Sequence, residues 1–233
     1  MKGFILAGGE GTRLRPLTLE IPKPLLPVGK IPLLTYLIDL FLDYDINDIK
    51  INIQKKHLED FYKWKATYFP QEDIDFIVEE KPSGTFTPIA KKTDPDWFSE
   101  TILVSNGDEL KELDLTKMTE WHKEKEALVT VGLVEVENPQ DYGSVKMEGD
   151  KIIKFGEKAE EPLSSYINSG LYVMGPEVKN YFEKDTDFAM LETDLFPSLA
   201  KERKLFGYKW QGRWKDIGTL ERWERAIKNW NQK

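Results

Sequence analysis

The first 110 residues alternate between short apolar runs and longer amphipathic segments, and this alternation constrains the fold more than any other feature. Four apolar runs are short enough to be buried strands: residues 2–6, 48–53, 74–80 and 101–108. Two segments carry apolar residues at helical spacing: residues 32–45 and 57–69. Strands that alternate with helices are typical of crossover units in a parallel sheet. We therefore predict an α/β fold with helices on both faces of a mostly parallel sheet.

The second half of the chain has a more β-rich pattern. We expect strands at residues 127–136 and 166–174, a hairpin at 144–155, and a strand-like segment around a turn at 206–217. An interrupted helix is expected at 191–203, and a closing helix at 219–233 with Thr219 as its N-cap. The sheet should thus be mixed. The whole chain, residues 1–233, is expected to form one domain, because no linker composition divides it.

Composition narrows the classes of partner. The net charge of −8 argues against broad binding to nucleic acid or to an anionic membrane. The chain has no cysteine, which excludes disulfides and thiolate metal sites. The apolar run at the N-terminus is five residues at most, and no apolar stretch approaches the length of a membrane span. A cytoplasmic protein is the expectation.

The loop after the first strand, LAGGEGTRLRP at residues 6–16, predicts a phosphate site. Glycines let the backbone N–H groups approach a ligand closely, and Arg13 can bond two phosphate oxygens at once. Lys23 stands between two prolines that stiffen the backbone around it. The loop lacks the third glycine of a dinucleotide fingerprint and the Gly-Lys-Ser/Thr of a P-loop. A glycine turn without a ligand is the plainer alternative.

Two aspartates are candidates for a metal site. Asp108 follows a predicted buried strand beside Gly107, and Asp216 lies in a second strand-to-helix turn. Two such carboxylates can converge on Mg²⁺, which takes one or two carboxylates together with phosphate oxygens and water. The alternative for either residue is an N-cap or turn role. His57 and His122 are expected on exposed helix surfaces, without a catalytic role.

Several segments, taken together, resemble one family. Six segments resemble the motifs of sugar-1-phosphate nucleotidylyltransferases. They are LAGGEGTRLRPLT…IPKPLLPV…PLL, LVSNGDEL (103–110), DYGSVKM (141–147), FGEKAEEP (155–162), YINSGLYVM (166–174) and WKDIGTLERWERA (214–226). The segments occur in the family's order over nearly the full chain. The resemblance implies a Rossmann-like, glycosyltransferase-A-like fold. No hexapeptide repeat follows, so the C-terminal β-helix of longer relatives is not expected.

The resemblance also implies a reaction. A sugar 1-phosphate would attack the α-phosphate of a nucleoside triphosphate in line, and pyrophosphate would leave, with Arg13 and Lys23 neutralising charge. Asp108 would be catalytic and, with Asp216, would hold Mg²⁺. Residues 1–110 would form the nucleotide-binding part, 111–218 the sugar-binding part and 219–233 the closing helix. Nucleic acid and membranes are not expected partners. Relatives are often homo-oligomers, although no motif here marks an interface.

The remaining site residues follow from the same resemblance. The residues implied at the nucleotide are Leu6, Ala7, Gly8, Gly9, Gly11, Thr12, Gly84, Thr85 and Gly107. Those implied at the sugar phosphate are Tyr142, Gly143, Glu157, Lys158 and Asn168. For Asn168 the alternative is a strand amide satisfied by the backbone.

The base-reading segment departs from the family pattern. In KPSGTFTPIA (81–90), Gly84 and Thr85 match, whereas Phe86 and Thr87 replace smaller residues and leave the choice of base open. IPKPLLPVGKIPLL resembles mannose- and heptose-1-phosphate guanylyltransferases, which favours GTP, with UTP next. Two alternatives remain: a phosphocholine cytidylyltransferase and a catalytically silent regulatory homologue. A nicotinamide-dependent oxidoreductase is disfavoured by the missing third glycine and by Pro16.

Overall fold

The computed structural model describes residues 1–156, 161–183 and 185–230, and the chain divides into two compact units. The N-terminal unit comprises residues 2–82, 105–112 and 212–233. The central unit comprises residue 1 and residues 83–104 and 113–211. Strand β6 (Ile102–Asn106) carries the chain from the central unit into the N-terminal unit. Both units combine strands with helices, so the α/β class predicted from the sequence is confirmed.

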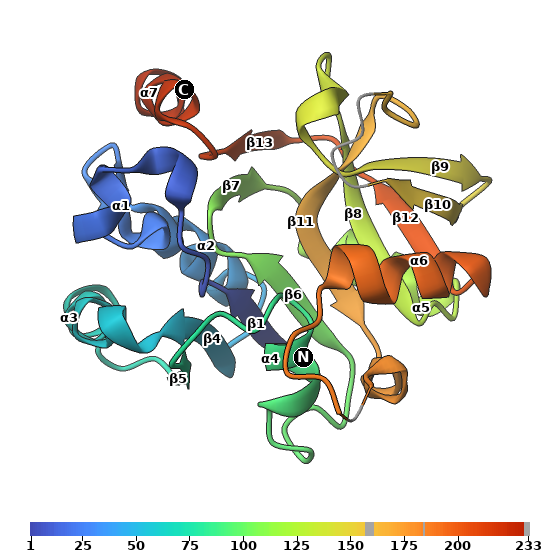
Figure 1. Cartoon of the computed structure of the whole chain (residues 1–233), viewed down its shortest axis with the longest axis horizontal. Helices are drawn as coiled ribbons and strands as arrows, with labels where there is room; N and C mark the ends of the chain where they lie inside the picture. Colours follow the sequence, from blue (N-terminus) through green and yellow to red (C-terminus); the bar gives the residue numbers. More distant parts are fainter. Residues whose placement is uncertain (157–160, 184, 231–233) are drawn as a thin grey trace. The chain divides into compact units, whose positions relative to one another are not determined.

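A parallel sheet organises the N-terminal unit. Strands β1 (Lys2–Leu6), β4 (Ile49–Gln54) and β5 (Ile74–Glu79) lie side by side with β4 in the middle (Figure 1). Ile51 pairs with Ile5 on one side and with Phe76 on the other. The crossovers between these strands contain helices α2 (Leu33–Leu42) and α3 (Leu58–Tyr68). The predicted strand and helix pattern of this part is therefore confirmed.

The segment between β1 and α2 consists of short elements. It contains 3-10 helices at Thr12–Leu14 and Lys23–Leu25, helix α1 (Leu17–Glu20), and the paired strands β2 (Pro27–Val28) and β3 (Ile31–Pro32). Pro22 and Pro24 are both buried, so the backbone on each side of Lys23 is anchored in the fold.

A second pair of strands completes the N-terminal unit. Strand β7 (Glu109–Glu112) pairs antiparallel with β13 (Arg213–Asp216), and helix α7 (Leu220–Asn229) follows. The Thr219 hydroxyl accepts a hydrogen bond from the backbone N–H of Arg222 and so caps α7, as predicted. A buried cluster fixes these elements to one another: Val28, Leu33, Leu110, Ile217, Ala226 and Trp230.

The central unit has a mixed sheet with the strand order β11-β8-β12-β10-β9. The strands are β8 (Val129–Glu135), β9 (Ser144–Glu148), β10 (Lys151–Gly156), β11 (Tyr166–Met174) and β12 (Leu205–Lys209). β8 runs antiparallel to β11 and parallel to β12, and β9 and β10 form the predicted hairpin. The helices are α4 (Thr87–Lys91), α5 (Leu115–Glu124) and α6 (Phe196–Lys201), the last continuing a π-helical turn at Leu191–Leu195.

Two differences from the sequence-based expectation matter for the site. Segment 206–217 is strand-like around a turn, as predicted, but its two strands do not pair with each other: β12 (Leu205–Lys209) pairs with β8 and β10, while β13 pairs with β7. Strand β7 was not predicted, since its sequence ELKE carries three charges and is typical of a loop. Among the described residues, no helix has the length and apolar character needed to cross a bilayer.

Candidate functional site

The glycine loop after β1 lies against the ends of neighbouring strands. The carbonyl of Leu6 accepts a hydrogen bond from the Gly107 N–H at 2.9 Å, and the Ala7 N–H donates to the Asn52 carbonyl at 3.0 Å. The carbonyl of Gly8 accepts from the Gln54 amide at 2.6 Å. A Cβ on Gly8 would lie 2.7 Å from Oδ1 of Asn52, so a larger residue there would displace the Asn52 side chain. The loop is therefore held close to the carboxyl ends of the parallel strands, where such sheets bind ligands.

Two further glycines of the loop differ in role. Gly9 is exposed, and a Cβ there would meet nothing within 4 Å. Gly11 has a φ of 60°, and its Cβ position lies 2.9 Å from Cγ2 of Thr18 and 3.3 Å from Cβ of Lys23. Gly11 thus adopts the left-handed backbone that glycine favours, and Lys23 packs closely against it. The exposed Thr12 and Arg13 follow directly on this turn.

Lys23 and Asp108 form an ion pair in the N-terminal unit. The Lys23 ammonium donates a hydrogen bond to Oδ2 of Asp108, across 85 positions of sequence. Burial alone would raise the pKa of Asp108, but the Lys23 ammonium, with help from Lys111, outweighs it and holds the pKa below its usual value. Asp108 is therefore ionised at neutral pH, as a metal ligand or a phosphate-site carboxylate must be.

Asp216 lies beside Asp108. In the β7–β13 ladder Asp216 pairs with Glu109, and the Ile217 N–H is 3.4 Å from the Asp108 carbonyl oxygen. The two aspartates, here called the carboxylate pair, thus come from neighbouring positions of adjacent backbone segments. Oδ2 of Asp216 accepts hydrogen bonds from the Gly218 N–H and from Nη1 of Arg222, both at 2.9 Å.

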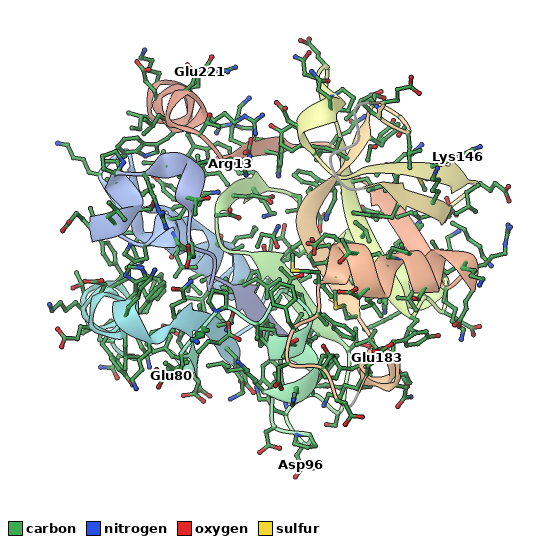
Figure 2. The ribbon with its side chains drawn as sticks, in the orientation of Figure 1. Arg13, Glu80, Asp96, Lys146, Glu183 and Glu221 are labelled. Carbon is green, nitrogen blue, oxygen red and sulfur yellow. The ribbon has the colours of Figure 1, made fainter. Side chains whose placement is uncertain are left out.

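Arg13 approaches the same place. Its Nη2 lies 3.5 Å from the position that a Cβ would take on Gly218, two residues after Asp216. Figure 2 shows Arg13 on the loop that follows β1, on the side of the N-terminal unit where β13 and α7 lie. The structure therefore brings together, within this unit, all four residues predicted at its phosphate and metal site: Arg13, Lys23, Asp108 and Asp216.

A buried polar layer supports the carboxylate pair and was not predicted. Glu109 accepts hydrogen bonds from Trp214 Nε1 at 2.8 Å and from the Asn106 amide at 3.1 Å. It also forms a 3.1 Å ion pair with Lys111, whose side chain is fully buried. Burial raises the pKa of Glu109. Trp214 thus orients the carboxylate next to Asp108.

The carboxylate pair suits a hard divalent cation by its chemistry. Both residues present carboxylate oxygens, and each already holds one positive side chain, Lys23 on Asp108 and Arg222 on Asp216. No cluster of three or more His, Cys, Asp or Glu suited to a metal occurs in the part of the chain that the structure describes. Two carboxylates are enough for Mg²⁺, which keeps water and phosphate oxygens as its other ligands.

Three buried polar side chains at the ends of β4 and β5 were also not predicted. Asn52, Gln54 and Glu79 are between 2% and 5% exposed, in strands whose other residues are largely apolar. Oε2 of Glu79 lies 3.1 Å from the Cβ position of Gly8, so the carboxylate reaches the glycine loop. The available signal was a polar residue at the last position of each strand, since buried polar residues there usually serve a ligand or a neighbouring loop.

In the central unit, Gly84 and Thr85 tie the base-reading segment to residues 189–192. The Thr85 hydroxyl donates to Glu192 at 2.7 Å and accepts from the Leu191 N–H at 2.8 Å. Phe86 is buried against Phe182, with ring centroids 5.4 Å apart. The Thr87 hydroxyl accepts from the Ala189 N–H at 2.9 Å. Phe86 and Thr87, the two residues that depart from the family pattern, thus make packing and hydrogen-bond contacts within the central unit.

Part of the predicted sugar-phosphate set is also brought together in the central unit. The Asn168 N–H donates to the Gly143 carbonyl at 2.8 Å, next to the half-buried Tyr142. The Asn168 amide donates to the Tyr172 hydroxyl at 2.8 Å and accepts from the Gly170 N–H at 2.9 Å. Its side chain is therefore oriented by the protein. Glu157 and Lys158 lie outside the described residues.

The two histidines were expected on exposed helix surfaces, but His122 is buried and His57 is half-buried. His122 is only 4% exposed, and its Nδ1 lies 2.8 Å from the Thr130 hydroxyl. It faces the central unit's sheet because α5 packs on β8 through this side. His57 is partly buried beside Asp60, at 3.6 Å. Burial lowers the pKa of both rings, that of His122 to about 4.

Comparison of the sequence with known proteins finds similarity to nucleotidyl transferases. The family model for nucleotidyl transferase matches residues 2–233. The chain is 33% identical to mannose-1-phosphate guanylyltransferase of Mycobacterium tuberculosis, over 95% of this chain and 62% of the relative. It is also 33% identical to mannose-1-phosphate guanyltransferase of Saccharomyces cerevisiae, over 94% of this chain and 61% of the relative. The chain thus spans about three fifths of the length of these relatives.

Solved structures show the same architecture. A candidate glucose-1-phosphate thymidylyltransferase of Bacillus anthracis, in complex with sucrose, superposes with a TM-score of 0.88 at 29% identity, over 98% of this chain and 94% of that one. HddC from Yersinia pseudotuberculosis complexed with GMP-PN gives 0.83 at 25% identity, over 99% of both chains. The Rossmann-like mixed α/β fold expected from the sequence is therefore confirmed.

Proposed function

The chain belongs to the nucleotidyl transferase family, and from that premise we propose that it transfers a nucleotidyl group from a nucleoside triphosphate to a sugar 1-phosphate and releases pyrophosphate. The observation that carries the proposal is the convergence of Arg13, Lys23 and the carboxylate pair beside the glycine loop. Cations, carboxylates and backbone N–H groups in one place suit a triphosphate with its metal ion better than any other common ligand.

The reaction explains why charged side chains suffice. A sugar 1-phosphate has a second pKa of about 6, so at neutral pH it is largely a dianion and can attack without a general base. Catalysis then consists of holding the reactants in line and neutralising the charge on the α-phosphate and the leaving pyrophosphate. We assign that neutralisation to Arg13, which is exposed next to the loop, and to Lys23, which anchored prolines hold in place.

Asp108 and Asp216 are the residues that we assign to Mg²⁺. When bound, the ion would withdraw charge from the α-phosphate oxygens and keep them in a fixed orientation. Asp108 suits this role because its low pKa keeps it ionised. Of the other residues that we propose at the nucleotide, Gly9 is exposed, Gly11 makes the left-handed turn, Gly8 and Gly107 pack closely against neighbouring residues, and Leu6, Ala7 and Thr12 set the path of the loop.

GTP is the triphosphate that we favour, with UTP next. Guanine presents adjacent N1–H and N2–H donors, and the carboxylate of Glu79 can accept from both. Uracil presents one N–H between two carbonyl oxygens, which a carboxylate repels. The mannose-1-phosphate guanylyltransferase relatives and the relative complexed with GMP-PN support the same base.

For the sugar 1-phosphate we propose contacts in the central unit. Gly143 and Asn168 are joined by a backbone hydrogen bond, and Tyr142 is next to them. Glu157 is proposed to accept from sugar hydroxyls, and Lys158 to hold the phosphate. Gly84 and Thr85 are proposed to act at the nucleotide through the turn that they form.

The test is pyrophosphate release with Mg²⁺ across a grid of substrates. The five common nucleoside triphosphates are each combined with mannose, heptose, glucose, N-acetylglucosamine and galactose 1-phosphates, and with phosphocholine. We expect the strongest signal with GTP and mannose or heptose 1-phosphate. A signal with phosphocholine alone would replace the proposal by a cytidylyltransferase, and silence in every combination would overturn it.

A further inference from the structure

We propose that Arg222 is a positioning residue that holds the carboxylate of Asp216 ready for the divalent cation. This inference rests on the proposed function, because it gives Asp216 the role of a metal ligand. Arg222 was not among the residues predicted from the sequence, where it reads as one more charge on an amphipathic helix. Its contact with Asp216 indicates a role different from that of Arg225, which lies on the same helix and forms an exposed pair with Glu221.

The contact fixes one oxygen of Asp216 from two directions. Nη1 of Arg222 donates to Oδ2 at 2.9 Å, and the Gly218 N–H donates to the same oxygen at 2.9 Å. The side chains of Arg222 and Asp216 are only 17% and 14% exposed, so solvent screens the pair weakly. Because two donors hold Oδ2, the carboxylate group of Asp216 has a fixed orientation, and the direction of Oδ1 is fixed as well.

Arg222 is itself fixed by helix α7. Its backbone N–H is capped by Thr219, and one helical turn later Ala226 is fully buried in the cluster with Val28 and Leu110. Trp223 adds a hydrogen bond from its Nε1 to the Pro27 carbonyl at 2.9 Å. The guanidinium is therefore carried by a helix start that is anchored to the same unit as β13, and not by a mobile loop.

Gly218 makes this arrangement possible. A Cβ at this position would lie 2.5 Å from Oδ2 of Asp216 and 3.4 Å from Nη1 of Arg222. A side chain there would push the carboxylate and the guanidinium apart. The glycine between strand and helix thus serves the Asp216–Arg222 contact.

The two members of the carboxylate pair differ in their partners. Asp108 is paired with Lys23, a compact point charge that we assign to the phosphates of the nucleotide. Asp216 is paired with a guanidinium whose planar fork keeps its geometry. Groups that orient a metal ligand in this way typically contribute about 10- to 100-fold to metal affinity.

Binding of Mn²⁺, measured by electron paramagnetic resonance in the absence of sugar phosphate, tests the role of Arg222 without turnover. Arg222→Met removes the charge and the fork, and Arg222→Lys keeps the charge alone. Arg225→Met is the matched control, because Arg225 lies on the exposed face of the same helix and pairs with Glu221 at 2.7 Å (Figure 2 labels Glu221). Thermal unfolding of each variant reports whether the fold is kept.

We expect Arg222→Met to weaken Mn²⁺ binding about tenfold or more, Arg222→Lys to restore part of it, and Arg225→Met to leave it unchanged. Turnover by Arg222→Met should recover at high Mg²⁺, which a misfolded protein would not do. Wild-type Mn²⁺ affinity in a folded Arg222→Met or Arg222→Lys variant would overturn the inference, as would an equal loss in Arg225→Met. Such an outcome would leave the proposed function standing if the wild-type protein still forms a nucleotide-sugar.

Discussion

Lys23 donates a hydrogen bond to Oδ2 of Asp108, so the cation assigned to the phosphates and a carboxylate assigned to the metal are partners in the same unit. The pairing keeps the pKa of Asp108 low although desolvation of the carboxylate alone would raise it. The pairing also neutralises the ammonium of Lys23, whose side chain is largely buried. A change at Lys23 should therefore alter the pKa of Asp108, and a change at Asp108 should free the Lys23 ammonium from its present position.

Replacement of Asp108 by asparagine should abolish turnover and leave the fold intact. The amide keeps the size of the side chain but removes the charge that Lys23 and the metal need, and we expect kcat/KM to fall by at least about 100-fold. Pyrophosphate release and thermal unfolding are the measurements. Glu112→Gln, at the end of the strand that follows Asp108 and in an exposed pair with Arg213, is the control and should keep its activity. Activity at the wild-type level in Asp108→Asn would remove the metal assignment.

Glu79→Gln should narrow the preference for GTP over UTP. The amide loses one of the two acceptor interactions with guanine and no longer repels uracil, so the ratio of kcat/KM values for GTP and UTP should fall by about 10- to 100-fold. Glu80→Gln is the neighbouring control, since Glu80, which Figure 2 labels, is exposed and pairs with Lys55. An unchanged ratio in Glu79→Gln, or an equal fall in Glu80→Gln, would place the base elsewhere.

The parts of this site that could be predicted from the sequence are those carried by local motifs. The glycine loop, Lys23 between prolines and Asp108 after a buried strand each combine a backbone constraint with a functional group. Glu109, Lys111 and Glu79 could not be assigned in the same way, because their roles depend on pairings between distant segments. Strand β7 pairs with β13 about a hundred positions away, and nothing in ELKE marks that partner. His122 was misjudged for the same reason: its helix faces β8, which the local pattern does not reveal.

Gly84→Ala should destabilise the central unit more than Gly149→Ala. Both glycines have positive φ, 92° and 58°, so either substitution strains the backbone and should cost about 1 kcal/mol. A Cβ on Gly84 would also overlap the carbonyl of Ala189, whereas a Cβ on Gly149 would meet nothing within 4 Å. We expect an additional loss of about 2 kcal/mol or more in the free energy of unfolding for Gly84→Ala. Equal losses in urea denaturation would mean that the turn at Gly84 yields easily and does not hold residues 189–192 in place.

His122 should make the protein less stable as the pH falls below neutrality. The ring binds a proton at pH 6.5 when unfolded but only at about pH 4 when folded, because burial disfavours its charged form. Stability is therefore lost between these two values, and the loss from pH 7 to pH 5 should be about 2 kcal/mol. His122→Gln keeps a partner for Thr130 and cannot titrate, so its unfolding free energy should fall less over the same interval. Urea denaturation of both proteins at pH 7 and pH 5 measures the difference, and identical pH dependence would mean that His122 becomes protonated in the folded protein with little cost.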